Sequence, residues 1–215
     1  MAKPKPPKQA TDAQARTLLD CYHCPVPFHA VRTRFLGAVA SLDPASTPMR
    51  ALESLWGGHL PTFNNINDVS ELMSVLLMGL WDRISQHQDQ AVPFHLTRLT
   101  VPATLAGLIQ MARLREEELQ GFRDGLFGDS TELDLPETAH KAVGTLSEIR
   151  AMIRGTREVF EDPAKGGSSE DIAISLRQFQ EMTEIAEFQM HQAVLSCTRA
   201  RRHLMAMPPN SPARH

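Results

Sequence analysis

Apolar residues recur along much of the chain at spacings of three and four positions, which is the pattern of amphipathic helices. Residues 68–86 show it most clearly, and the apolar face there consists of Val69, Leu72, Met73, Leu76, Leu77, Leu80, Trp81 and Ile84. Asp68 with Glu71 forms a capping signature at the start of this segment. Residues 91–102 contain strand-forming Val, Thr and Phe between prolines, but no second strand is predicted that could pair with them. We therefore expect a helical protein in which this connector is a loop.

Five further helices are predicted from periodicity and end signals, over residues 11–22, 29–42, 48–56, 103–127 and 133–160. The first begins at a capping box made by Thr11 and Gln14. The third begins where Thr47 precedes Pro48, since proline is tolerated in a first helical turn. We expect the helix over 103–127 to be interrupted near residues 115–118. The helix over 133–160 carries an apolar face made of Val143, Leu146, Ile149 and Ile153.

The last predicted helix covers about residues 170–207, a stretch without glycine or internal proline, and Ser168 with Asp171 caps it. Two seven-residue series run through it, one of Leu176, Thr183, Met190, Cys197 and Leu204, the other of Ile172, Phe179, Ala186, Ala193 and Ala200. They form a thin heptad seam, because Ala, Thr and Cys are small knobs. The helix would be roughly 55 Å long. It would lie across the domain or pair with a second copy of itself.

These elements predict an all-α helical bundle of six or seven helices with a long C-terminal helix. We expect a disordered tail over residues 1–10, a helical domain over 11–160, a linker over 161–169, the long helix, and a second disordered tail over 208–215.

Composition supports a folded soluble protein, with 42% apolar and 22% charged residues. A net charge of −3 gives no overall field that would attract nucleic acid or an anionic membrane. The N-terminus lacks the apolar stretch of a signal peptide, and the longest apolar run, residues 75–81, is too short to span a bilayer. Three cysteines without an export signal predict reduced thiols in a cytoplasm.

The stretch "ELQGFRDGLFGD" raises the question of a phosphate-binding loop, because it contains Gly121, Gly125 and Gly128. Such a loop follows a strand, whereas helix-forming residues precede these glycines, and the nearby acidic residues would repel an anion. Gly121 and Gly125 are four apart, so they lie on one helical face and allow close helix contact. Gly128 is interpreted as the helix terminator.

Two sets of residues could hold a metal ion. In "CYHC", Cys21 and Cys24 could supply half of a zinc site, completed by Cys197 and His203 if the chain ends meet. On the last helix, Glu184, Glu187 and His191 have spacings that can bind a metal. For the first set we favour simple thiols, because no paired motif accompanies it. For the second we favour a solvated helical face, because no matching set exists on another helix. We assign no metal and no cofactor.

Catalytic and nucleic-acid motifs are weak. No Ser, Cys or Thr lies in a nucleophile-elbow context, so no catalytic residue is assigned. The stretch "CTRARRH" places Arg199, Arg201, Arg202 and His203 near the end of the last helix. Cations there are favoured by the negative end of the helix dipole, which requires no partner. They could also contact phosphates of RNA or DNA, although no reader motif accompanies them.

Three blocks follow one another in a recognisable order, "RFLGAVAS", "MRALESLWGGHLPTFNNINDVSELMSVLLMGLWDRI" and "LQGFRDGLFG". This order resembles the YecA/YgfB-like family of uncharacterised bacterial proteins over about residues 28–160. Leu119 and Gln120 depart from it, because the family tends to have Trp and a small residue there. The C-terminal zinc module of many YecA-type members is also missing from this sequence. The resemblance implies an all-α fold and no established catalytic residues.

From these observations we expect a non-enzymatic cytoplasmic interaction or regulatory protein that acts through helical surfaces on a protein partner. A homodimer through the C-terminal helix is one expected form, and membrane binding is not expected. Two alternatives stay open. One is a metal-binding helical protein or enzyme that uses Glu184, Glu187 and His191 or the Cys21 and Cys24 pair. The other is a nucleic-acid-associated regulator that uses the basic end of the last helix.

Overall fold

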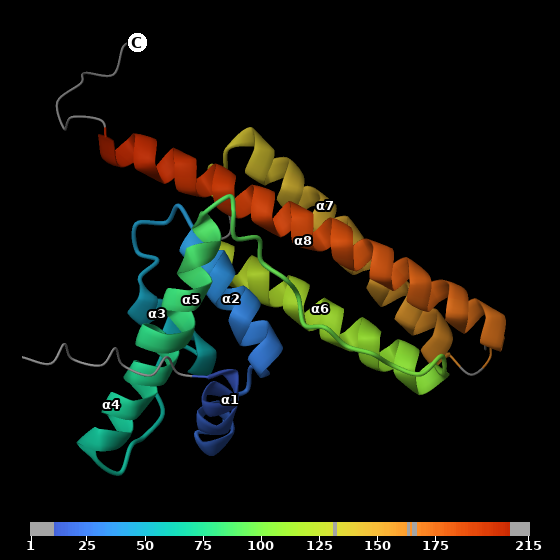
Figure 1. Cartoon of the computed structure of the whole chain (residues 1–215), viewed down its shortest axis with the longest axis horizontal. Helices are drawn as coiled ribbons and strands as arrows, with labels where there is room; N and C mark the ends of the chain where they lie inside the picture. Colours follow the sequence, from blue (N-terminus) through green and yellow to red (C-terminus); the bar gives the residue numbers. More distant parts are fainter. Residues whose placement is uncertain (1–10, 131–132, 163, 165–166, 207–215) are drawn as a thin grey trace, which may run out of the picture.

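The computed structural model describes residues 11–130, 133–162, 164 and 167–206, and Figure 1 shows how they are arranged. Within these ranges all regular elements are helical, which confirms the predicted all-α class. The elements are α1 (Asp12–Cys21), α2 (Phe28–Ala40), α3 (Pro48–Glu53), η1 (Ser54–Trp56), α4 (Ile66–Val75), η2 (Leu76–Trp81), α5 (Asp82–Ser85), η3 (Gln86–Gln88), α6 (Leu105–Phe127), α7 (Glu137–Glu161) and α8 (Ser169–Ala206). The tails predicted over 1–10 and 208–215 lie outside the described residues.

The predicted capping boxes are formed at α1 and α8. The Thr11 N–H donates to Gln14 Oε1 at 2.8 Å, and the Gln14 N–H donates to Thr11 Oγ1 at 3.2 Å. At α8, the Ser168 N–H donates to Asp171 Oδ2 at 2.9 Å and the Asp171 N–H donates back to Ser168 Oγ at 3.2 Å. Each box satisfies N–H groups that the first helical turn would otherwise leave without a partner.

The start predicted at Asp68 is wrong, because α4 begins two residues earlier. The Asn65 side chain accepts from the N–H groups of Asn67 at 2.9 Å and of Asp68 at 3.1 Å, and asparagine is itself a preferred N-cap residue. Helix α4 then continues through a π-helical turn, η2, into α5 and η3. Its predicted apolar face is confirmed at its centre, where Leu72, Leu76, Leu80 and Ile84 are buried.

Helices α2 and α6 cross at backbone contact, and glycines make this possible. A Cβ atom added at Gly121 would lie 2.5 Å from Ala30 O, and one added at Gly125 would lie 2.9 Å from Ala38 N and closer still to Arg34 O. Gly37 on α2 meets the carbonyl of Phe122 in the same way. The packing interpretation of these glycines is therefore confirmed. Gly128 has a φ of 55° and ends α6, as predicted.

The interruption expected near residues 115–118 is wrong, because α6 is continuous from Leu105 to Phe127. Arg115 and Glu118 lie in the middle of its core-facing stripe, in register with Met111 and Phe122, and both are buried. They pair with each other inside the protein, which lets the helix keep charged residues on its buried face.

Helices α7 and α8 form a long antiparallel hairpin that extends beyond the rest of the molecule and packs along α6 (Figure 1). Towards its C-terminal end α8 also contacts α2 and η3. The predicted heptad seam of α8 is buried within the chain from Ile172 to Cys197, whereas Leu204 is exposed. The long helix therefore lies across the domain, and its seam is covered by the protein's own helices.

The connector between η3 and α6 contains no strand, as predicted. Figure 1 shows it running along α6 towards the N-terminal end of that helix. Phe94 and Leu96 are buried in the core that the helices share, whereas His95 and Arg98 remain exposed. An extended segment that forms no sheet must satisfy its backbone groups elsewhere.

Candidate functional site

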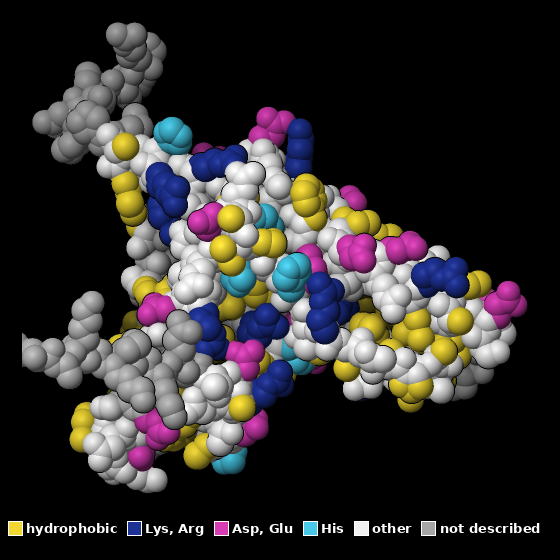
Figure 2. Space-filling view, viewed as in Figure 1, with side chains coloured by type: hydrophobic (Ala, Val, Ile, Leu, Met, Phe, Trp, Pro, Cys, Tyr) yellow, Lys and Arg dark blue, Asp and Glu magenta, His cyan; other side chains and the backbone are white. Residues whose placement is uncertain are grey.

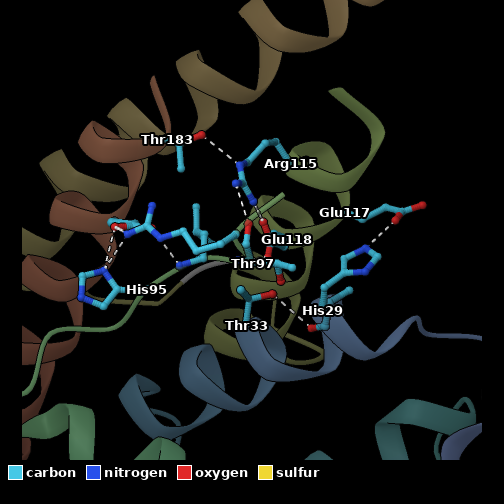
Figure 3. A network of polar contacts seen from close by, with 12 residues as sticks. His29, Thr33, His95, Thr97, Arg115, Glu117, Glu118 and Thr183 are labelled. Carbon is cyan, nitrogen blue, oxygen red and sulfur yellow. Dashed lines mark hydrogen bonds and ion pairs between the residues drawn. The ribbon is translucent and has the colours of Figure 1, made fainter. Parts of the chain in front are cut away.

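A buried polar cluster joins the connector to α6 and α8, and Figure 3 shows it from close by. Arg115 donates to Thr183 Oγ1 at 2.9 Å and to the carbonyl of Thr97 at 2.8 Å, and it also donates to the Glu118 carboxylate. Glu118 accepts from the Thr97 N–H at 2.8 Å. The Arg115 and Glu118 side chains therefore hold both backbone groups of one connector residue.

A second carboxylate, that of Glu187 on α8, holds the next part of the connector. It accepts from the Leu96 N–H at 3.0 Å, from the His95 ring at 2.8 Å and from Arg98 at 3.1 Å. Charged partners strengthen such hydrogen bonds and offset the cost of burying a carboxylate. Together, Glu118 and Glu187 supply the acceptors that a sheet would otherwise provide for the connector.

The hydrogen bonds of this cluster tie the connector to α6 and α8, and the bond from Arg115 to Thr183 also joins α6 to α8 directly. We call Arg115, Glu118 and Glu187 with their connector partners the polar clasp. The geometry indicates a structural fastening of the connector, with His95 and Arg98 at its solvent-exposed edge.

The set of Glu184, Glu187 and His191 does not converge. Glu184 is exposed, whereas Glu187 and His191 are buried, so the interpretation of a solvated face is wrong for two of the three. Both oxygens of Glu187 face the connector, and neither ring nitrogen of His191 has a hydrogen-bond partner among the described residues. In that part of the chain, no group of three or more His, Cys, Asp or Glu residues is arranged to hold a metal ion.

The three cysteines are free thiols. Cys21 is exposed, and Cys24 is half-buried with its thiol 3.8 Å from the Leu55 carbonyl. Burial raises the pKa of the Cys24 thiol, and it raises the pKa of the Cys197 thiol to about 11. Neither of these two thiols is an activated nucleophile at neutral pH, because the thiolate is the reactive form.

The basic residues near the end of α8 differ in their surroundings. Arg201 donates to the carbonyl of Val39 at 2.8 Å and to that of Ser41, so it satisfies the C-terminal end of α2. Burial lowers the pKa of Arg201. Arg199 and Arg202 line a hollow of about 660 Å³ beside η3, together with Gln88 and Asp89. His203 is exposed.

The polar clasp is not among the sites predicted from the sequence, although one signal for it exists. Arg115 and Glu118 continue the three- and four-residue spacing of Leu108, Met111 and Phe122, so the helical pattern alone places them on the buried face. Two charged residues of opposite sign at such positions, three apart, indicate a buried pair. No comparable signal marks His95 and Thr97, which lie in an irregular segment.

Among the described helices, none combines the length and apolarity that a membrane span requires. Comparisons with protein-family models, with curated proteins and with solved structures find no match for this chain. The resemblance to the YecA/YgfB-like family therefore stays a prediction.

Proposed function

We propose that this chain is a non-enzymatic, cytoplasmic interaction or regulatory protein that acts through its helical surfaces. The outward face of α8 supports this proposal most directly. Ile185 is 47% exposed and Phe188 is 58% exposed, and their spacing of three places them side by side on the helix. Ile174, eleven residues before Ile185, falls on the same face. Aromatic and large aliphatic side chains of this kind are typical anchors of protein–protein interfaces.

The space-filling view adds a second apolar region. Figure 2 shows hydrophobic side chains gathered at the end of the molecule where α6 and α8 begin. Leu105, at the start of α6, is also exposed. Glu181 and Glu184 are exposed one turn before Ile185 and Phe188, and their charge disfavours an anionic membrane or nucleic acid as the partner. We therefore favour a protein partner with an apolar surface.

A homodimer remains one form of this proposal, but it would use different residues from those predicted. The heptad seam is buried against α7, α6 and α2 within one chain. Two copies would therefore meet through the outward face of α8, where Ile185 and Phe188 are exposed.

The proposal is tested by replacing Ile185 and Phe188 together with alanine. A photo-reactive phenylalanine analogue in place of Phe188 should form one dominant cross-link in the native cytoplasm, and the double replacement should abolish co-purification of the same partner. The matched control replaces Met152 and Val159, an exposed apolar pair on α7, and should leave co-purification intact. Light scattering of the purified chain separates a second copy from a different protein. Equal cross-linking from positions 152 and 188 would contradict the proposal.

A further inference from the structure

Arg34, on the face of α2 that crosses α6, has no ionic partner among the residues that the structure describes. Its side chain is half-buried, its Nε atom is buried without a hydrogen-bond partner, and no ion pair to it is formed among the described residues. An arginine side chain stays charged under all ordinary conditions, so it cannot avoid the cost of burial by losing its proton. An unpaired cation in such a place is destabilising unless an anion compensates it.

The position of Arg34 is fixed by the helix crossing. Its carbonyl lies against Gly125, and Ala38 one turn later also contacts that glycine. On this face of the molecule Arg34 lines three neighbouring hollows, of about 70, 310 and 620 Å³. Arg34 therefore lies where three openings adjoin, and its backbone is held in place by the contact with Gly125.

A second unpaired arginine lines the hollow of about 310 Å³, which we call the Arg34 cleft. This residue is Arg150 on α7, and its Nε atom is also buried without a hydrogen-bond partner in the described part of the chain. The cleft is bounded by the link between α1 and α2, by α6 and by α7, and its lining includes Pro25, Val26, Pro27 and Ala30. Two cations from different helices thus share one opening with an apolar wall.

The acidic residues of the same cleft already have partners. Arg157 donates to Glu116 at 2.6 Å, His29 lies 2.6 Å from Glu117, and Gln120 donates to Asp124. Their contacts leave Arg34 and Arg150 as the unmatched groups. They also set a limit on the ligand, because three nearby carboxyl groups would repel a multiply charged anion more strongly than a singly charged one.

From this arrangement we propose that the Arg34 cleft binds the carboxylate of a small acid or of a peptide C-terminus. A carboxylate carries a single charge, and its planar pair of oxygens matches the fork of a guanidinium. A cleft of about 310 Å³ has the size of small-ligand sites, and its proline, valine and alanine wall would contact an apolar stem next to the carboxylate. This site is separate from the outward face of α8 and does not depend on it.

Thermal unfolding in the presence of millimolar probes tests the proposal, because a ligand that binds only the folded state raises the melting temperature. The probes are acetyl-Ala-Val-Leu with a free C-terminus, the same peptide as its C-terminal amide, pentanoate, and inorganic phosphate. We expect a rise with the free peptide and no rise with the amide. A comparable rise with pentanoate identifies a small acid as sufficient, and a rise with the free peptide alone identifies a chain terminus. Both results support the site.

Arg34→Gln and Arg150→Gln should each weaken binding of the free peptide at least tenfold in calorimetric titration. Arg177→Gln, which removes an exposed arginine on α8, should leave it unchanged. If Arg34→Gln fails to fold, the affinity of Arg150→Gln for the free peptide tests the proposal by itself. The proposal is overturned by equal effects of free acid and amide, by full binding in the glutamine variants, by a response to phosphate alone, or by no response to any probe.

Discussion

The contact between α2 and α6 makes a sharp prediction for Gly125→Ala. The new Cβ atom would lie 2.8 Å from the Arg34 carbonyl carbon and 2.9 Å from Ala38 N, whereas ordinary contacts begin at 3.4 Å. These are backbone atoms of a packed helix, so no flexible side chain can move aside. The two helices would have to separate locally by about half an ångström or more, and their shared core would separate with them.

Two opposing effects set the magnitude of this change. Overpacking against backbone costs about 3 kcal/mol, near the upper end of the usual range, because several atoms are blocked at once. Alanine in place of glycine inside a helix recovers about 1 kcal/mol through helix propensity. We therefore expect a net loss of about 2 kcal/mol in the free energy of unfolding. For a chain of this size that corresponds to a melting temperature lower by about 4–8 °C.

Urea unfolding followed by far-ultraviolet circular dichroism measures this loss. An unchanged dependence of the free energy of unfolding on urea concentration would show that the unfolded state is the same. Gly144→Ala on α7 is the matched control, because no atom lies within 4 Å of its added Cβ. That variant should be stabilised by about 0.5–1 kcal/mol, since only propensity acts there. If Gly125→Ala proves as stable as Gly144→Ala, the two helices do not meet at backbone contact and the described core is wrong.

Three further outcomes follow from other parts of the structure. Arg115→Met should lower the free energy of unfolding by about 3–5 kcal/mol, because it leaves the buried Glu118 without its cation, and adding Glu118→Met should recover part of the loss in urea titrations. Hydrogen bonds from the Ser168 side chain and backbone lower the pKa of Asp171 below its ordinary 3.8, so this carboxylate stabilises the fold above that pH. The stability advantage of the native chain over Asp171→Asn should therefore be present at neutral pH and shrink as the pH falls below 3.8, and a gap that widens on acidification would contradict this. Iodoacetamide at neutral pH should modify the exposed Cys21 first and Cys197 only after unfolding, as mass spectrometry of cysteine peptides would show.

Local periodicity was enough to predict most helices, because most apolar residues on one face of each helix are buried in the same core. Predicting the start of α4 failed because Asn65 and Asp68 are both good capping residues, and only the chain path decides between them. The long helix α8 was predicted correctly, but its sequence left open whether the seam packs across the domain or against a second copy of the chain. Periodicity indicates that a helix face is buried, but it does not tell whether the residues that bury it belong to the same chain.

The polar clasp and the Arg34 cleft were harder to predict from the sequence, since both depend on contacts between distant segments. Glu187 and His191 are one turn apart, yet one holds the connector and the other has no partner among the described residues. Arg34 carries a weak signal, because Ala30, Arg34 and Ala38 repeat every four residues on the face with Gly37. That spacing places Arg34 at a close crossing, but whether an acid stands opposite it is settled only by the fold.

The polar clasp also bears on the order in which the chain assembles. Leu96 and Glu187 are 91 positions apart, and the Thr97 N–H donates to Glu118 on α6. Closing so large a loop is entropically costly and is compensated only when both helices are already in place. We therefore expect the connector to be among the last segments to become ordered during folding. Glu187→Gln should accordingly speed unfolding and leave the folding rate nearly unchanged, the kinetic signature of a contact made after the transition state.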